Sequence, residues 1–305
     1  MANIAKIFVI IVTYKGHRWY ERCFTSLRAS EYPVQTIVID NASNDGTVEY
    51  IREYFPEIHL IESKENLGFG RANNIGMRYA LDHGCDYVFL LNQDTWIEPS
   101  SISELVKIHQ QYPEYGVISP MHVTADKKAL YIEIEDGKTD HANSLLSDCY
   151  FQSLKDVYTF KYINAAAWLM TRQTLETVGG FDPIFFLYGE DDNYLQRMEY
   201  HGVKLGLAPK IQITHDHQNG ERNNSNENRH YRYIQSKLVE YTNILRPRST
   251  RGYLRYLYRK LLVGLFLFNK QSITQYIEEI RLLHKYKIQI QNSRKINSIK
   301  QSSWL

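Results

Sequence analysis

The sequence predicts an α/β fold with a mostly parallel central sheet and a helical appendage at its C-terminal end. Over the first hundred residues, short apolar runs alternate with stretches of helical periodicity, which is typical of βαβ units and a parallel sheet. From Arg229 onward glycine and proline become scarce, and Tyr, Arg, Lys, Leu and Ile dominate. We therefore expect an α/β domain over residues 1–228 and a basic, Tyr-rich helical region over residues 229–305.

The local pattern defines each expected element. Strands that are buried on both faces read as continuous apolar runs, and four such runs occupy residues 7–12, 36–39, 58–61 and 87–91. Helical spacing is found over residues 19–30, 45–55 and 66–83, the last after a glycine-rich start. Farther along, we expect a helix from about residue 101, weak patterning over 127–155, an apolar run at 165–170 and a helix at 190–201.

The composition excludes several classes of protein. The 305-residue chain is 43% hydrophobic and 23% charged, which is ordinary for a globular protein with a sizeable core. Its formal net charge of +2 gives no argument for a nucleic-acid partner. Three widely separated cysteines form neither a disulfide framework nor a metal-binding spacing, which suits a reducing cytoplasm. Residues 7–12 are too short for a secretory signal, and no stretch approaches the roughly 20 apolar residues that cross a bilayer.

The fourth expected strand ends abruptly in Asn92-Gln93-Asp94-Thr95. Ligands of open α/β sheets bind outside the carboxyl ends of the strands, so Asp94 is placed where a divalent cation and its phosphate ligand could meet. A carboxylate together with substrate phosphates is a usual way of holding such a cation. The alternative is a turn or helix cap, since Asn, Asp and Thr all serve there.

Polar residues also follow the other three strands. Thr13 and Tyr14 follow the first strand, and Asp40, at the end of the second, could accept a hydrogen bond from a pyrimidine imide. After the third, Gly68-Phe69-Gly70 allows a close backbone approach, and Arg71 supplies a charge suited to phosphate. Loop and cap chemistry is the alternative for Asp40. Neither Gly-x-Gly-x-x-Gly nor a Walker loop is present, which disfavours Rossmann dehydrogenases and P-loop NTPases.

Three consecutive acids, Glu190, Asp191 and Asp192, begin the later helix. Successive helical residues point about 100° apart, so only one or two of the three can face a common pocket. Glu190 or Asp191 could remove a proton from an acceptor hydroxyl. The alternative is an exposed acidic turn with Arg197 as a surface partner.

Two histidines, His215 and His217, end a stretch of alternating apolar residues. A histidine at a strand end can complete a metal site with Asp94 and two phosphate oxygens, and a solvated loop histidine is the alternative. The pattern does not choose between them, because both lie on the same face.

Taken together, these segments resemble the family 2 glycosyltransferases, which have the GT-A nucleotide-sugar-binding fold. The form is most similar to bacterial rhamnosyltransferases that build cell-surface polysaccharides. The resemblance covers about residues 7–217 and divides the α/β domain into a nucleotide half, about residues 1–100, and an acceptor half, about residues 101–228. The matching segments are VIIVTY at 9–14, VIDNASNDGT at 38–47, ENLGFGRANN at 65–74, LNQDT at 91–95, and GGFD at 179–182 through Glu190-Asp191.

The resemblance implies a role for each site residue. Asp94 matches the last acid of the family's Asp-x-Asp metal motif, His215 a histidine that helps bind metal or diphosphate, and Asp191 the catalytic base, with Glu190 beside it. Asn92 replaces the first acid of that motif, and Asn193 stands where a further acid is common. Trp168 and Asp192 would line the donor sugar or the acceptor. The residues implied for nucleotide binding are Thr13, Tyr14, Asp40, Asn66, Gly68, Arg71, Asn92 and Gln93.

The implied reaction is an inverting sugar transfer from a nucleoside-diphosphate donor to a hydroxyl of a glycan or lipid-linked acceptor, with Mg²⁺ or Mn²⁺ as cofactor. The leading donor is dTDP-L-rhamnose, and UDP-hexoses and galactofuranose remain alternatives. A sugar nucleotidyltransferase fits less well, because its Gly-rich loop with Arg after the first strand is missing. A catalytically inactive module that binds nucleotide sugars is a further alternative.

The C-terminal region has its own two interpretations. Its apolar stretch at residues 261–268 is flanked by Arg255, Arg259, Lys260 and Lys270. Such a stripe could lie in the interface of the cell membrane's inner face, near a lipid-linked acceptor, as a peripheral contact. It could equally pack onto the catalytic domain or onto a second subunit of a homo-oligomer.

Overall fold

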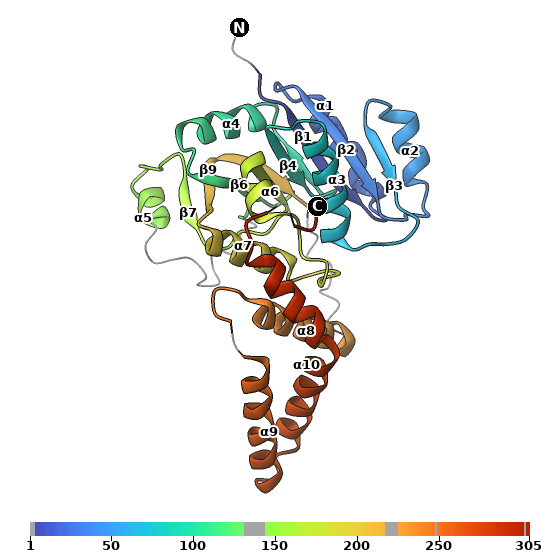
Figure 1. Ribbon diagram of the computed structural model, residues 1–305. Helices are drawn as coiled ribbons and strands as arrows, with labels where there is room; N and C mark the ends of the chain where they lie inside the picture. The colour runs from blue at the N-terminus through green and yellow to red at the C-terminus, as the bar shows by residue number, and fades with distance from the viewer. Residues whose placement is uncertain (1–3, 131–143, 217–224, 248, 302) are drawn as a thin grey trace.

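Figure 1 shows the computed structural model of the chain, in which an α/β domain carries a pair of long helices that project away from it. The structure describes residues 4–130, 144–216, 225–247, 249–301 and 303–305. Within these ranges the strands form a nine-stranded sheet in the order β3-β2-β1-β4-β8-β6-β9-β5, with β7 paired to β9.

The first four strands are parallel neighbours, as the sequence predicts. They are β1 (Ile7–Thr13), β2 (Val34–Asp40), β3 (His59–Glu62) and β4 (Tyr87–Leu91). The helices that connect them are α1 (His17–Arg28), α2 (Thr47–Tyr54) and α3 (Phe69–Asp82). The carboxyl ends of these four strands therefore meet at one edge of the sheet.

The second half of the sheet mixes strand directions. Its strands are β5 (Thr95–Ile97), β6 (Tyr115–Val123), β7 (Tyr158–Phe160), β8 (Ala167–Thr171) and β9 (Lys204–His215). Strands β6 and β9 run with the first four, whereas β5, β7 and β8 run against them. Most described strands thus share one direction, and the expected sheet is confirmed.

Helices cover both faces of the sheet. Alternate residues of each central strand point to opposite sides, and apolar side chains on both sides need to be covered. On β1, Phe8 and Ile10 belong to a core shared with α3, and Ile7 and Val9 belong to a core shared with α1. The remaining helices of the α/β domain are α4 (Ser101–Gln111), α5 (Leu145–Tyr150), α6 (Arg172–Val178) and α7 (Glu190–His201).

The C-terminal region consists of α8 (Asn226–Thr242), α9 (Thr250–Phe266) and α10 (Lys270–Asn297). Helices α9 and α10 form an antiparallel hairpin, and the last turns of α10 return to the α/β domain (Figure 1). There the Asp182 carboxylate accepts hydrogen bonds from Ser293 Oγ at 2.6 Å and Asn297 Nδ2 at 2.8 Å, all three side chains being buried. The hairpin is therefore fixed to the loop that precedes α7.

A buried carboxylate joins the three C-terminal helices. Glu279 on α10 accepts hydrogen bonds from Tyr233, Tyr241 and Tyr253 and forms an ion pair with Lys237 at 3.2 Å. Burial by itself raises the pKa of Glu279, but the hydroxyl of Tyr233 and the charge of Lys237 outweigh it, so the pKa is lowered. This cluster accounts for several of the chain's abundant tyrosines.

Candidate active site

The carboxyl end of β4 and the beginning of α7 meet through one short segment. The Asn92 backbone N–H donates to the Ala166 carbonyl at 2.9 Å, where β4 pairs with β8. One residue earlier, the Ala165 N–H donates to Asp191 Oδ2 at 3.1 Å. The segment before β8 thus spans from the Asn92–Asp94 turn to the acidic start of α7, and the two acidic positions lie at the same edge of the sheet.

Strand pairing brings Asp94 and His215 together. Strands β5 and β9 pair so that Thr95 lies opposite His215, and the Asp216 N–H donates to the Asp94 carbonyl at 2.8 Å. His215 Nε2 lies 3.4 Å from Asp94 Oδ1, and their side chains are 5% and 14% exposed. The other predicted histidine, His217, lies outside the described residues.

The donor set of this pair fits a divalent cation that also takes oxygens from a substrate. A carboxylate and an imidazole lie within reach of one another, and both are nearly buried. No cluster of three or more His, Cys, Asp or Glu side chains in the described ranges could hold a metal ion. Two protein ligands leave positions open, and phosphates and water commonly fill them around Mg²⁺.

His122 on β6 is a neighbour of His215 that sequence reasoning did not identify. The two rings are nearly perpendicular, with centroids 5.9 Å apart, and His122 Nε2 lies 3.1 Å from Ser119 Oγ. Burial, followed by the nearby His215, lowers the pKa of His122 to about 3, so its ring is neutral at physiological pH. Its position between apolar residues of a strand resembles an ordinary core site, which is why the pattern did not reveal it.

Thr13 and Asp40 form a buried pair at the ends of β1 and β2, where the strand register places them opposite each other. Thr13 Oγ1 donates to Asp40 Oδ1 at 3.0 Å, and the Ser43 N–H donates to Oδ2 at 2.9 Å. Each carboxylate oxygen can accept more than one hydrogen bond, so Asp40 is oriented without being saturated.

Tyr14 and Gln93 connect the loops after β1 and β4. The Tyr14 N–H donates to Gln93 Oε1 at 2.9 Å, and Gln93 Nε2 donates to the Tyr14 carbonyl at 3.2 Å. A Cβ on Gly16 would lie 2.5 Å from Gln93 Oε1, so a larger residue there would displace the Gln93 amide. Gln93 therefore sets the spacing of these two loops, and its predicted contact with nucleotide stays a prediction.

Asn66 and Gly68 hold the loop before α3. Asn66 Oδ1 accepts hydrogen bonds from Asn41 Nδ2 and from the Gly68 N–H, both at 2.9 Å. Gly68 has φ of 80°, and a Cβ on it would lie 2.0 Å from the Phe186 carbonyl oxygen. The close backbone approach is thus to the loop before α7. A role of either residue in lining the nucleotide site stays a prediction.

Arg71 contacts the same loop. Its Nε and Nη2 donate to the Pro183 carbonyl at 3.2 and 2.8 Å, and its side chain is exposed. An interaction of Arg71 with phosphate stays a prediction. It requires the guanidinium to turn away from the Pro183 carbonyl or to donate to the carbonyl and the phosphate together.

The acidic triplet at the start of α7 is divided by burial. Glu190 is 5% exposed, whereas Asp191 and Asp192 are half-buried. Burial, with a smaller contribution from the charge of Asp192, raises the pKa of Glu190 to about 7. Glu190 Oε2 has no hydrogen-bond partner among the described residues. One acid is therefore held in a nearly dry environment while its neighbour is fixed by the Ala165 N–H.

Two residues near this turn, one basic and one aromatic, are buried inside the protein. The idea of Arg197 as a surface partner of the acids is wrong, because its guanidinium is fully buried and donates to the Val178 and Gly180 carbonyls. Trp168 is also fully buried and packs against Phe181 and Tyr194. Its predicted contact with donor or acceptor stays a prediction, since that contact requires the ring to become exposed.

The family follows from comparison with known proteins. Residues 8–169 match the family model described as glycosyl transferase family 2, which is more than half of the chain. The chain belongs to glycosyl transferase family 2. The part of the chain that matches the family model runs from β1 to β8 and contains the Asn92–Asp94 turn.

Several curated relatives carry related names. The chain is 27% identical over 231 residues to an N-acetylglucosaminyl-diphospho-decaprenol L-rhamnosyltransferase of Mycobacterium tuberculosis, covering 68% of this chain and 75% of that protein. It is 23% identical to the dTDP-rhamnosyl transferase RfbF of Shigella flexneri, covering 69% of each chain. It is 24% identical to the low-salt glycan biosynthesis hexosyltransferase Agl10 of Haloferax volcanii, covering 68% of this chain and 66% of that protein. The chain thus spans about two thirds to three quarters of these relatives.

Solved structures share the fold. A mannosyltransferase of Pyrobaculum calidifontis, solved with GDP-Man and Mn²⁺, superposes with a TM-score of 0.57 at 18% identity, covering 93% of this chain and 76% of that one. TarS of S. aureus, solved with UDP, also has a TM-score of 0.57, at 12% identity, covering 96% of this chain and 90% of that one. The expected GT-A fold is confirmed.

Proposed function

We propose that this family 2 member is a metal-dependent, inverting glycosyltransferase that acts in cell-surface polysaccharide synthesis. Its leading donor is dTDP-L-rhamnose, and its acceptor is a hydroxyl of a glycan or of a lipid-linked glycan. The single observation that carries the proposal is the connection of the Asp94–His215 pair to Asp191 through Ala165 and Ala166, which joins a metal-type ligand pair to a candidate base. The names of the curated relatives support rhamnose as the sugar.

The proposed roles at the donor end follow from the ligand chemistry. Asp94 and His215 would hold Mg²⁺ or Mn²⁺, which when bound neutralises the charge that develops on the leaving diphosphate. The structure of a related fold with GDP-Man and Mn²⁺ supports a metal of this kind. Asp40, oriented by Thr13 and the Ser43 N–H, would accept a hydrogen bond from the pyrimidine base.

At the acceptor end, we assign the proton transfer to Asp191. Its carboxylate is oriented by the Ala165 N–H and is half-buried, so it can accept the proton of an acceptor hydroxyl as that oxygen attacks the anomeric carbon. Glu190 is less suited, since only 5% of it is exposed. Attack on the face opposite the leaving group inverts the anomeric configuration and needs no covalent enzyme intermediate.

Incubation with a panel of nucleotide sugars, with and without Mn²⁺, tests the proposal. Release of nucleoside diphosphate supports glycosyl transfer, whereas release of pyrophosphate would indicate a nucleotidyltransferase. Replacing Asp191 with asparagine should abolish turnover and leave donor binding intact, because the side chain keeps its shape and loses its basicity. Unchanged biological function in that variant would favour an inactive binding module.

The same panel separates the donors. A hexosyltransferase among the relatives favours a UDP-hexose as the second candidate, with galactofuranose as a third. We expect nucleoside diphosphate to be released faster from dTDP-L-rhamnose than from the other nucleotide sugars. A cytoplasmic location and a homo-oligomeric state stay predictions.

A further inference from the structure

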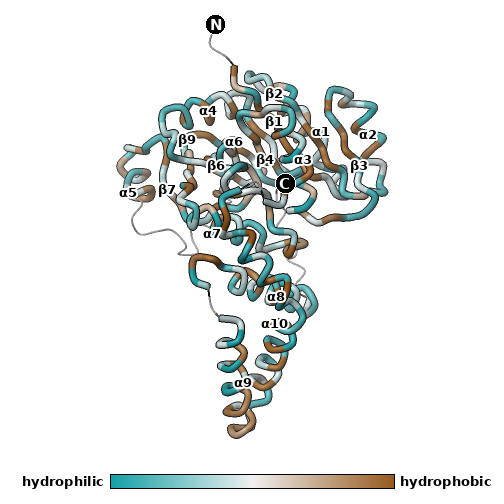
Figure 2. The backbone as a smooth tube through the Cα atoms, viewed as in Figure 1, coloured by the Kyte–Doolittle hydropathy of each residue, from teal (hydrophilic) through white to brown (hydrophobic). Residues whose placement is uncertain are grey.

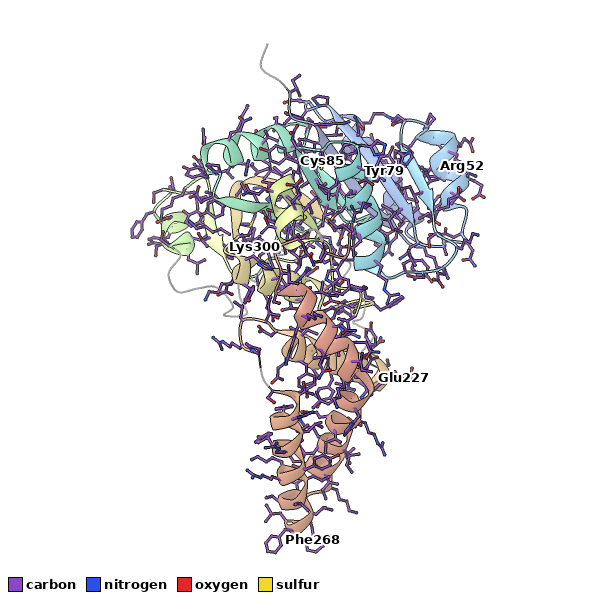
Figure 3. The ribbon with its side chains drawn as sticks, viewed as in Figure 1. Arg52, Tyr79, Cys85, Glu227, Phe268 and Lys300 are labelled. Carbon is purple, nitrogen blue, oxygen red and sulfur yellow. The ribbon has the colours of Figure 1, made fainter. Side chains whose placement is uncertain are left out.

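The hairpin of α9 and α10 ends in an apolar tip that the catalytic chemistry does not use. Figure 1 shows the hairpin projecting away from the α/β domain, and Figure 3 places Phe268 at its far end. In the hydropathy view of Figure 2 this end of the hairpin is hydrophobic. The exposed apolar side chains of the tip are Leu262 (66%), Val263 (53%), Leu265 (50%), Phe266 (82%), Leu267 (65%) and Phe268 (88%).

The tip is an ordered turn. The Leu267 N–H donates to the Val263 carbonyl at 2.9 Å, and the Asn269 N–H donates to the Gly264 carbonyl at 3.0 Å. Asn269 then caps α10 by accepting a hydrogen bond from the Ser272 N–H at 3.1 Å. These backbone N–H groups of the turn thus have internal partners, which lowers the cost of moving the turn out of water.

The charge around the tip is one-sided. Residues 250–277 contain the five basic residues Arg251, Arg255, Arg259, Lys260 and Lys270 and no acidic residue, although the whole chain has a net charge of only +2. The remainder of the chain is therefore net negative. All five basic side chains are exposed. Residues 250–277 are therefore a positively charged segment of a protein whose remaining residues are net negative.

The exposed side chains of α9 form two successive zones, an apolar end and a zone in which aromatic and basic residues alternate. The apolar residues occupy the end, and the exposed Tyr256 and Tyr258 lie behind them together with Arg255, Arg259 and Lys260. At a rise of about 1.5 Å per residue, Arg259 lies about 10 Å along the helix axis from Phe266. In a bilayer, the acyl chains and the interfacial region with its anionic headgroups follow one another over comparable distances.

We propose that the tip of the α9–α10 hairpin inserts into the interface of an anionic lipid bilayer and anchors the protein there as a peripheral contact. The six apolar side chains enter the acyl boundary, and the basic residues contact headgroup phosphates. A second copy of the chain fits the tip less well, because a tip-to-tip contact would bring two acid-free, positively charged segments together. Within the described ranges, none of the helices has an apolar stretch that could span a bilayer.

The anchor also has a defined connection to the active site. The far end of α10 is bound through Ser293 and Asn297 to Asp182, eight residues before Glu190 in the chain. α9 has 17 residues, which corresponds to about 25 Å. An inserted tip therefore tethers the catalytic domain close to the surface without pressing its sheet edge against the lipid.

Vesicle co-sedimentation of the full-length protein tests the tip directly. The wild type should bind vesicles of equal parts phosphatidylglycerol and phosphatidylcholine at least tenfold more tightly than vesicles of phosphatidylcholine alone. The double variant Phe266→Ser/Phe268→Ser should lose at least about tenfold in binding, because two large apolar groups no longer leave water. The matched control is Phe151→Ser at the C-cap of α5, a phenylalanine that is 73% exposed and distant in sequence, and it should bind as the wild type does.

Two further measurements make the outcome decisive. Arg255→Gln and Arg259→Gln should each weaken binding about fivefold, and the difference should shrink in high salt. The fluorescence of a Phe268→Trp variant should be quenched by brominated lipids beyond the quenching of the wild type. Wild-type affinity in the double serine variant, or absence of quenching, would overturn the proposal. So would a tip-dependent change in sedimenting mass without lipid, which would identify a second copy as the occupant. None of these measurements requires donor or acceptor, so their failure leaves the proposed glycosyl transfer standing, and loss of transfer leaves the anchor standing.

Discussion

Replacing Glu190 with glutamine should make the protein progressively more stable than the wild type as the pH rises from about 5 to about 8. In the folded state burial raises the pKa of this carboxyl from 4.5 to about 7, and the nearby Asp192 adds to the shift. Between these two values the unfolded chain has released its proton while the folded chain still holds it. Folding therefore binds a proton, and the stability of the wild type falls as the pH rises through this window.

The size of the effect follows from the shift. One pKa unit corresponds to about 1.4 kcal/mol, so an upward shift from 4.5 to about 7 costs the wild type about 3 kcal/mol once the pH exceeds both values. Part of this cost is already present at pH 5, which leaves about 2 to 3 kcal/mol to develop by pH 8. Glutamine does not titrate and can still accept the backbone hydrogen bonds of the turn, so the variant lacks this dependence.

Chemical denaturation of both proteins across this pH range measures the difference. The control is Glu199→Gln, which alters an exposed acid on the same helix. We expect the stability gap between Glu190→Gln and the wild type to widen by about 2 to 3 kcal/mol and the control to run parallel to the wild type. Parallel curves for Glu190→Gln, or a gap that narrows with pH, would refute the assigned burial and pKa.

The same variant separates two candidate bases. If Asp191 takes the acceptor proton, Glu190→Gln retains most of the turnover of the wild type, and the pH–rate profiles of the two proteins match near pH 7. If Glu190 were the base, the rate of the wild type would rise through pH 7 as its carboxyl ionises, and the variant would be inactive. Measuring the pH–rate profile of both proteins decides between these outcomes.

Two more variants, with Gly46→Ala as a control, address the metal ligand and the loop before α3. We expect Mn²⁺ to raise the melting temperature of the wild type in a thermal-shift assay. Asp94→Asn should lose this rise and at least about 100-fold in turnover, because a neutral amide replaces the carboxylate ligand; equal turnover would remove Asp94 from the site. Gly68→Ala should destabilise the fold by at least about 2 kcal/mol, since its φ is 80° and the new Cβ would meet the Phe186 carbonyl at 2.0 Å. Gly46→Ala, with φ of 85° and nothing within 4 Å, should cost about 1 kcal/mol, and equal costs for the two would contradict the steric argument.

The parallel half of the sheet could be predicted from the sequence because its causes are local. The buried strands β1 and β4 read as apolar runs, the helices between the strands show their own period, and consecutive βαβ units place neighbouring strand ends at one edge. The expected strand at 58–61 forms as β3, but it lies at the edge of the sheet and is not buried on both faces. The second half follows other rules. Strand β9 pairs with β5, β6 and β7, and such long-range pairing leaves little trace in a local pattern.

The site shows the same division. The residue types at the strand ends and the acidic start of α7 are visible in the sequence, and so is the basic, acid-free stretch of the hairpin. Neither the burial of Arg197 nor the position of His122 beside His215 could be predicted, because each depends on segments far apart in the chain.

By itself, then, the sequence determined which chemical groups stand at the carboxyl edge of the sheet, since side-chain identity and strand period are properties of the chain alone. Only the tertiary structure decided that Glu190 is the buried acid while the Ala165 N–H orients Asp191, and that Phe268 lies at the far end of a projecting hairpin. Burial and exposure are set by neighbours that are distant in sequence, and they in turn fix the pKa of an acid and the partner of an apolar surface.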